Sequence, residues 1–279
     1  MITLSTPNEL KSRLARVEGF LLDMDGTFYL GDKLLPGALE FLEACARTGR
    51  PALFVTNNSS RDAAHYSQKL RRLGADVGPE RVLTSGAATA DYVLRSHPGA
   101  QAWVLGNPVL KAELAAFGVN VINADDEHYP KNAAQPIVVA GYDTTLSFEK
   151  LCVVCDLVRE GVPYIATHPD FNCPIENGYM PDLGAFIALI EASAGRRPDV
   201  IVGKPNRGLA DAAAHACGVP VEHLAMVGDR LYTDIPFGVR SGMTSILVLS
   251  GEATLEEAQA CDEPPHLIAH GLGDLATYL

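Results

Sequence analysis

The sequence predicts an α/β protein with a Rossmann-like core, built on a doubly wound parallel sheet, and an α/β domain inserted into that core. Short apolar runs alternate with amphipathic stretches through most of the 279 residues, which is the pattern of strands joined by helices. Polar residues follow several of the apolar runs directly. The interval from Thr56 to Lys204 is too long for a single crossover and contains its own alternation of strand and helix patterns.

The strand predictions rest on short apolar runs bounded by turn residues. These runs are residues 19–22, 51–56, 81–84, 102–106, 119–122, 137–141, 163–167, 199–203, 224–228 and 244–249. The helix predictions rest on apolar residues repeated at helical spacing. These stretches are residues 37–48, 61–73, 108–117, 147–160, 183–194 and 207–217. Near the N-terminus, Gly31-Asp32 in FYLGDKLL is typical of a two-residue hairpin turn.

Composition and charge narrow the classes of partner. With 47% hydrophobic and 20% charged residues, the chain can bury a sizeable core. Its formal net charge of −12 argues against nucleic acid, because binding a polyanion requires clustered Lys and Arg. No segment approaches the roughly 18 consecutive apolar residues of a membrane helix, and the N-terminal stretch lacks the apolar run of a signal peptide. We therefore expect no membrane partner and a cytoplasmic location.

Polar side chains follow four of the predicted strands at the point where each strand ends. They are Asp23 and Asp25 after the run 19–22, Thr56 at the end of 51–56, Lys204 after 199–203, and Asp229 and Asp234 after 224–228. The carboxyl ends of parallel strands meet at one edge of a sheet, and ligands of open α/β sheets bind at that edge. We therefore expect these side chains to line one pocket.

Carboxylates in one pocket repel one another, at a cost of about 4 kcal/mol for a pair about 4 Å apart at an effective dielectric constant of about 20. A hard cation relieves this repulsion, and Mg²⁺ suits a few carboxylates completed by water and substrate oxygens. Thr56, Lys204 and the backbone N–H groups around Met24 and Asn57 would offer donors and positive charge to a phosphoryl group. The residues therefore predict Mg²⁺-dependent phosphoryl transfer.

Four short motifs carry a resemblance to a known family. DMDGT at 23–27, TNNSS at 56–60, GKP at 203–205 and GDRLYTD at 228–234 resemble, in order, the motifs of the haloacid dehalogenase (HAD) superfamily of phosphohydrolases. The chain is most similar to subclass IIA, whose C2-type α/β cap lies between the second and third motifs. That subclass includes the NagD-like and p-nitrophenylphosphatase-like phosphatases.

The resemblance implies a role for each motif residue. Asp23 would attack phosphorus and form an aspartyl-phosphate, and Asp25 would protonate the leaving oxygen and then activate water. The Mg²⁺ ligands would be the Asp23 carboxylate, the Asp25 backbone carbonyl and Asp229, with Asp234 orienting a ligand or a metal-bound water. The phosphoryl group would be bound by Met24, Thr56, Asn57 and Lys204.

The resemblance also implies two domains. Residues 1–97 and 199–279 would form the catalytic core, and residues 98–198 the cap domain, which selects the substrate by contacting the leaving group. Within the cap we expect substrate contacts from the loop after the run 163–167 and from one residue that follows the preceding strand. The candidates are His168, Asp170, Asn172, Cys173 and Tyr142.

The expected function is hydrolysis of phosphate monoesters of small metabolites, such as a sugar phosphate, a nucleotide or a compound like p-nitrophenyl phosphate. Pyridoxal phosphate and phosphoglycolate are alternative substrates, although Cys173 stands where pyridoxal phosphate phosphatases are expected to carry a ring-contacting His. A receiver-type signalling module, a dehalogenase and a protein that binds phosphorylated ligands without turnover stay open as alternatives. Asp25 argues against the first two, since it supplies the base that hydrolyses a phosphorylated intermediate. The partner would be a small phosphorylated metabolite, and a homodimer is left open.

Overall fold

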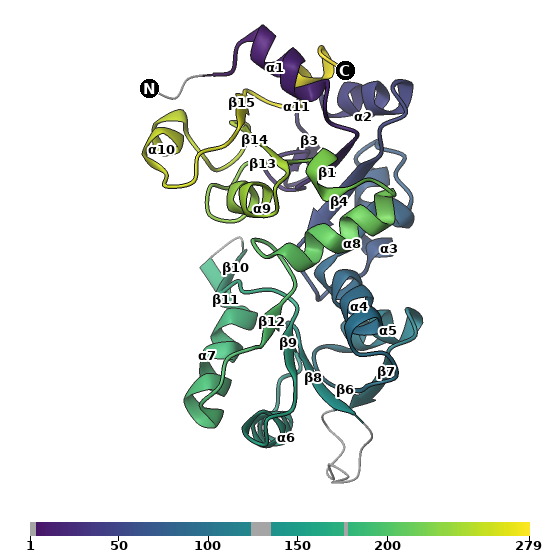
Figure 1. Ribbon diagram of the computed structural model, residues 1–279, viewed down its shortest axis with the longest axis vertical. Coiled ribbons are helices and arrows are strands. Elements are labelled where there is room, and N and C mark those ends of the chain that lie inside the picture. Colours follow the sequence, from purple (N-terminus) through teal and green to yellow (C-terminus); the bar gives the residue numbers. More distant parts are fainter. Residues whose placement is uncertain (1–3, 124–134, 176–177) are drawn as a thin grey trace. The chain divides into compact units, whose positions relative to one another are not determined.

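The computed structural model describes residues 4–123, 135–175 and 178–279 (Figure 1). The chain forms two compact units, which are described separately. The first unit contains Met1–Thr56, Ala63–Leu83 and Lys204–Leu279, and the second contains Asn57–Asp62 and Thr84–Gly203. Within the described residues, no helix combines the length and apolar character needed to cross a membrane.

The first unit is built on a six-stranded sheet in the order β15-β14-β13-β1-β4-β5. The strands are β1 (Gly19–Leu22), β4 (Ala52–Thr56), β5 (Val82–Thr84), β13 (Leu224–Gly228), β14 (Thr244–Val248) and β15 (Leu267–Ala269). β1 pairs in parallel with both β4 and β13, and β14 and β15 continue the parallel ladder beyond β13. Leu22 at the end of β1 pairs with Phe54 on one side and Val227 on the other, so the three strands end at the same edge.

Helices cover both faces of this sheet. One face packs against α1 (Pro7–Leu14), α2 (Ala38–Arg47), α3 (Ala63–Arg72) and α11 (Leu272–Ala276). In that core the rings of Phe20 and Phe41 meet edge to face with centroids 5.1 Å apart. The other face packs against α9 (Asp234–Arg240) and α10 (Leu255–Ala260). Because successive strand residues point to opposite faces, Ile246 belongs to the first core and Leu247 to the second.

Two further elements of the first unit lie outside the sheet. α8 (Arg207–Cys217) precedes β13, with a 3-10 turn at Val221–His223 between them. β2 (Tyr29–Leu30) and β3 (Lys33–Leu34) form an antiparallel hairpin beside the first motif. Leu30 pairs with Lys33, so Gly31 and Asp32 form the two-residue turn that the sequence predicted, and Gly31 has the positive φ of 59° that such turns require.

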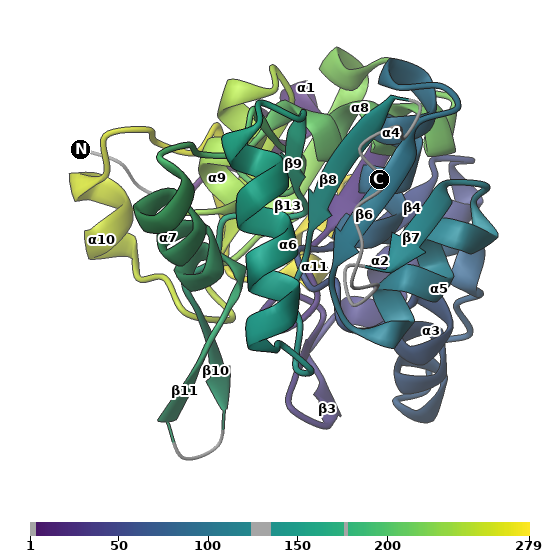
Figure 2. The same ribbon diagram turned by 90° about the horizontal axis from the view of Figure 1, so that it is seen from below.

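The second unit has its own parallel sheet of five strands in the order β12-β9-β8-β6-β7. The strands are β6 (Gln101–Leu105), β7 (Asn120–Asn123), β8 (Pro136–Ala140), β9 (Tyr164–Ala166) and β12 (Val200–Ile201). α6 (Phe148–Arg159) and α7 (Leu183–Ala194) pack on one face around Trp103 and Tyr164. α4 (Ser85–Ser96) and α5 (Pro108–Ala116) pack together on the other side of the sheet (Figures 1 and 2). β10 (Asn172–Ile175) and β11 (Gly178–Pro181) form a hairpin that extends away from α7 (Figure 2).

The predicted α/β class with parallel sheets is confirmed, but three segments that were expected in the core domain lie in the second unit, namely residues 57–62, 84–97 and 199–203. The sequence places residues 85–96 in the core domain, whereas α4 belongs to the second unit. Thr84 caps α4 and donates from Oγ1 to Glu113 Oε1 of α5 at 2.9 Å, which ties α4 to that unit. The sequence also assigns the run 199–203 to the core, whereas β12 pairs with β9. A short apolar run has no feature that selects one parallel sheet over another.

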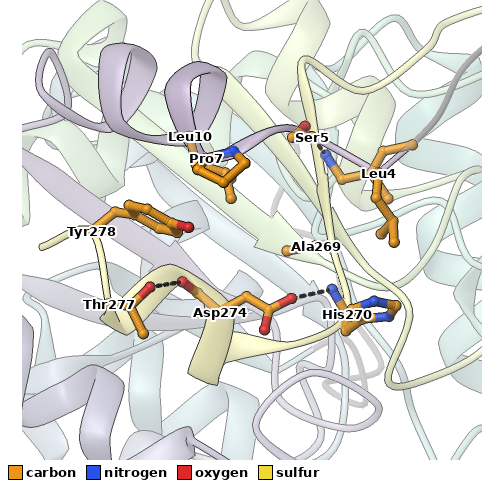
Figure 3. A pocket seen from close by; sticks show the side chains of 10 residues that line it. Leu4, Ser5, Pro7, Leu10, Ala269, His270, Asp274, Thr277 and Tyr278 are labelled. Atoms are coloured by element: carbon orange, nitrogen blue, oxygen red, sulfur yellow. Dashed lines mark hydrogen bonds between the residues drawn. The ribbon is translucent and has the colours of Figure 1, made fainter.

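A pocket in the first unit lies between α1, β15 and α11 (Figure 3). Its polar groups serve the local backbone, because Ser5 Oγ accepts from Ile268 N at 2.9 Å and Asp274 Oδ2 accepts from His270 N at 3.0 Å. Its lining includes none of the predicted site residues. The pocket therefore belongs to the seam that joins the N-terminal and C-terminal segments to the sheet.

Candidate active site

The carboxyl edge of the first sheet gathers residues from three neighbouring strands. Asp23 follows β1, and its backbone N–H donates to Val227 O of β13 at 2.9 Å. Asp229 directly follows β13, and Thr56 is the last residue of β4. Since β4 and β13 flank β1 in parallel register, these three residues converge as the sequence predicted.

Lys204 joins two buried carboxylates. Its Nζ donates to Asp23 Oδ1 at 2.5 Å and to Asp234 Oδ1 at 2.7 Å. Asp234 is the first residue of α9, and its Oδ2 accepts from Arg230 N at 3.2 Å. Lys204 does not follow a strand of the first sheet, because it is the residue at which the chain returns from the second unit to the first. Lys204 and Asp23 lie together, as expected for residues of one pocket, but the segment that crosses between the units brings Lys204 there and not a strand end of the first sheet.

Asp229 is held in place by two loops. Its Oδ1 accepts from Thr27 Oγ1 at 3.2 Å, and its Oδ2 accepts from Glu252 N at 2.8 Å. Gly26 and Gly251 lie against the same carboxylate, where an added Cβ would be 2.2 Å and 2.1 Å, respectively, from Asp229 Oδ2. Only residues without a side chain fit at both positions, so the direction of the Asp229 carboxylate is fixed.

The loop after β1 separates Asp25 from the buried acids. Phe28 N and Tyr29 N both donate to Met24 O, while the Met24 side chain is buried in the core. The Asp25 side chain is exposed, and its Oδ1 accepts from Gly31 N of the hairpin turn at 3.4 Å. Asp25 is thus exposed to solvent, whereas the other three carboxylates of the group are buried.

The charges of the site fit a divalent cation. Asp23, Asp229 and Asp234 each bring a carboxylate oxygen within 4.8 Å of the other two. Burial raises the pKa of both Asp229 and Asp234, and the charge of Asp23 raises them further. Burial opposes the charge of Lys204, but attraction to Asp23 and Asp234 outweighs it and raises the lysine pKa. Three carboxylates thus lie beside two cations, Lys204 and Arg230, which leaves the excess of negative charge that hard cations bind.

Asn57 lies in the second unit although Thr56, its neighbour in the chain, lies in the first. Residues 57–60 run along the carboxyl edge of the second sheet and contact the loops after three of its strands. Asn57 Nδ2 donates to Asp170 Oδ2 after β9 at 3.0 Å, and Ser59 Oγ accepts from Tyr142 N after β8 at 3.0 Å. Ser60 O accepts from Asn107 Nδ2 after β6 at 3.1 Å. The second motif therefore contributes to both units.

The predicted substrate contacts of the second unit differ in accessibility. His168 is 1% exposed, and its ring nitrogens lie 2.8 Å from Thr167 Oγ1 and 2.9 Å from Asp182 Oδ1. Tyr142 is also buried, with its ring stacked on Phe186 and its pKa raised by burial. By contrast, Asn172 is exposed, and Asp170 and Cys173 are half-buried.

Comparison with known proteins identifies the family. Residues 20–120 match the model of haloacid dehalogenase-like hydrolases, and residues 201–275 match that of HAD-hydrolase-like proteins. An acid sugar phosphatase of Staphylococcus aureus is 37% identical over 252 residues, which cover 90% of this chain and 94% of the relative. The chain belongs to the haloacid dehalogenase-like hydrolases.

Solved structures of similar proteins indicate the branch of the HAD hydrolases to which the chain belongs. A 4-nitrophenylphosphatase from Thermotoga maritima has a TM-score of 0.86 and 47% identity, with coverage of 95% of this chain and 98% of the other. NagD from Escherichia coli K-12 has a TM-score of 0.82 and 31% identity, with coverage of 92% and 98%. This HAD hydrolase is therefore a NagD-like phosphatase, as the resemblance of the four motifs predicted.

Sequence reasoning missed three residues that hold the Asp229 carboxylate or the loop beside it in this HAD phosphatase. Thr27 Oγ1 and Glu252 N donate hydrogen bonds to the Asp229 carboxylate, and Ser250 Oγ donates to Gly26 O at 2.9 Å. Ser250 and Glu252 follow β14, the strand next to β13. The rule that polar residues after neighbouring parallel strands share one edge would have found Ser250, whereas Glu252 acts through its backbone N–H, which no residue type signals.

Proposed function

We propose that this phosphatase hydrolyses phosphate monoesters of small metabolites through an aspartyl-phosphate on Asp23, with Mg²⁺ as its cofactor. The contact of Lys204 Nζ with Asp23 Oδ1 at 2.5 Å carries the proposal. It fixes one oxygen of the Asp23 carboxylate, and it brings a buried cation to the position where a phosphoryl group would add negative charge.

In the first step an Asp23 oxygen forms a bond to phosphorus while the bond between phosphorus and the ester oxygen breaks. Asp25, in its protonated form, donates its proton to the departing alcohol. In the second step the Asp25 carboxylate takes a proton from water, and the resulting hydroxide displaces Asp23 from phosphorus to release inorganic phosphate. Thr56, Lys204 and the backbone N–H groups of Met24 and Asn57 would donate to the phosphoryl oxygens throughout.

The Asp23 carboxylate, the Asp25 carbonyl and Asp229 would hold Mg²⁺, with Asp234 orienting these groups from outside the ligand set. The bound ion supplies positive charge to the phosphoryl oxygens and to the Asp23 carboxylate. The excess negative charge of three buried carboxylates beside Lys204 and Arg230 supports this assignment. Thr27, Glu252 and the two glycines would keep Asp229 in a conformation that can bind the ion.

The substrate class is proposed to be sugar phosphates, with p-nitrophenyl phosphate as a synthetic substrate. The names of the relatives from Staphylococcus aureus and Thermotoga maritima support both. Asn172 offers an exposed amide that can pair with sugar hydroxyls, and Cys173 lies beside it on β10. A panel of sugar phosphates, nucleoside monophosphates, phosphoglycolate and pyridoxal phosphate tests the substrate class, and a preference for pyridoxal phosphate would contradict it.

The mechanism is tested with p-nitrophenyl phosphate. Hydrolysis should require Mg²⁺ and stop with EDTA, and Asp229→Ala should raise the Mg²⁺ concentration needed for half-maximal activity. Asp23→Asn should abolish turnover but still bind substrate, and borohydride reduction during turnover should label Asp23 alone. Full activity of a metal-free sample, or a phosphate adduct on another residue, would contradict the mechanism.

A further inference from the structure

The Asn57 side chain is confined on both sides within the second unit. Its Nδ2 donates to Asp170 Oδ2 at 3.0 Å, and its Oδ1 lies where an added Cβ on Gly203 would be only 2.7 Å away. The Asn57 backbone carbonyl accepts from Ser85 Oγ at 2.5 Å. A carboxylate can only accept from an amide, so Asp170 fixes which end of the Asn57 side chain faces it.

Asp170 itself is anchored to α7. Its backbone carbonyl accepts from Gly184 N at 2.7 Å, and Gly184 has room only for hydrogen, because a Cβ there would lie 2.5 Å from Pro169 O. The loop after β9 therefore presents the Asp170 carboxylate from a fixed backbone. The contact with Asn57 links this loop to the second motif.

We propose that Asp170 is a positioning residue for Asn57 and does not read the leaving group, a role that rests on the proposed function because Asn57 is assigned there to phosphate binding. A carboxylate repels a phosphoryl dianion, so Asp170 affects phosphate binding through Asn57 and not by direct contact with the phosphate. Its acceptor oxygen is used instead to hold the amide of the residue after Thr56. This role differs from the substrate contact that the sequence predicted for Asp170.

The proposal makes the effect of Asp170 independent of the leaving group. Asp170→Ala should lower kcat/KM by about 10-fold to 100-fold, and by the same factor for p-nitrophenyl phosphate and for a sugar phosphate. Asp170→Asn retains an oxygen acceptor for the Asn57 amide and should keep most of the activity. Asn172→Ala, at the start of β10 two residues further along the chain, is the matched comparison, and it should lower kcat/KM for the sugar phosphate only. Asp156→Ala, on the exposed face of α6, controls for the loss of a negative charge.

A double-mutant cycle separates action through Asn57 from any other role. Asn57→Ala should remove the effect of Asp170, so Asp170→Ala in that background should cost less than about twofold further. The full loss repeated in the Asn57→Ala background would overturn the proposal. A loss confined to the sugar phosphate would also overturn it, since it would make Asp170 a reader of the leaving group.

The same cycle measured on the binding of inorganic phosphate in the presence of Mg²⁺ needs no turnover. Asp170→Ala should weaken phosphate binding in the wild-type background and leave it unchanged in Asn57→Ala. A wild-type protein that fails to hydrolyse any ester would contradict the proposed function, while this binding cycle would still decide the role of Asp170. Additive losses in phosphate binding would reject the positioning role alone.

Discussion

The Lys204 ammonium lies 2.5 Å from the Asp23 carboxylate, although 181 residues separate the two in the chain. The same ammonium reaches Asp234 at 2.7 Å, so one cation holds the nucleophile candidate and the start of α9 together. The contact therefore contributes to the first unit's fold, and in the proposed function it also contributes to the chemistry. Separate measurements of unfolding and of kinetics report the two effects.

Lys204→Met should lower kcat for p-nitrophenyl phosphate by about 100-fold to 1000-fold, because the buried positive charge near the phosphoryl oxygens is lost. It should also lower the free energy of unfolding by about 3 to 5 kcal/mol, since two buried carboxylates lose their shared partner. Steady-state kinetics and denaturant unfolding measure the two effects, with the exposed Lys11→Met as control. An unchanged kcat would remove Lys204 from the site.

Asp25→Asn should change the two chemical steps differently. Nitrophenolate leaves without much help from an acid, so with p-nitrophenyl phosphate the first step should continue while hydrolysis of the aspartyl-phosphate slows by about 100-fold or more. The covalent intermediate should then accumulate and appear as a burst of nitrophenol equal to the enzyme concentration. With a sugar phosphate the first step should slow as well, and no burst should form. A burst with both substrates would show that Asp25 does not supply the proton.

Gly251→Ala tests the fixed direction of Asp229. The added Cβ would meet Asp229 Oδ2 at 2.1 Å, so the carboxylate must move. We expect the Mg²⁺ concentration for half-maximal activity to rise by about tenfold or more, with a smaller change in kcat at saturating metal. Gly271→Ala is the matched control, because the nearest atom to its Cβ would be 4.0 Å away. Equal metal dependence of the two variants would contradict the assignment of Asp229.

The buried carboxyl of Glu113 should make the free energy of unfolding depend on pH, independently of catalysis. Burial raises the pKa of this carboxyl from 4.5 to about 7, although Thr84 Oγ1 donates to it. A carboxyl with a raised pKa favours the folded state when it is protonated, so its contribution is complete below pH 4.5 and is lost as the pH rises to about 7. The total loss would be about 3 kcal/mol.

Glu113→Gln should abolish this decline and leave the second unit more stable than wild type at pH 8. Denaturant unfolding at several pH values measures it, and exposed Glu160→Gln is the control. A wild-type stability that stays level between pH 4.5 and pH 7 would mean that Glu113 is ionised in the folded chain throughout.

Much of the fold could be predicted because strand and helix periodicity is strong in buried elements. The runs 19–22 and 224–228 and the helices 183–194 and 207–217 have the predicted bounds. α4 was missed because its small residues, from Ser85 to Ala90, are buried without an apolar stripe of large side chains. The hairpin β10–β11 was missed because all four residues of β11 are exposed and its sequence lacks alternation.

The candidate site was predictable where parallel register alone brings residues together, as with Asp23, Thr56 and Asp229. Lys204 reaches the site for a different reason. The strand before it, β12, belongs to the second sheet, and Lys204 is the first residue after the chain returns to the first unit. The burial of His168 could not be read from sequence either. Its contacts with Thr167 and Asp182 depend on how α7 starts beside β9.

The chain passes between its two units at 56/57, 62/63, 83/84 and 203/204. In a chimera that takes only residues 84–203 from a homologue, the loops after β6, β8 and β9 would come from the homologue. Residues 57–62, which include their hydrogen-bond partners, would still come from the original chain. Evolutionary exchange of caps faces the same constraint, since two discontinuous pieces of sequence must be inherited together. We expect recombinant hybrids to remain soluble and active when residues 57–62 come from the cap donor, and to lose both properties when they come from the core donor.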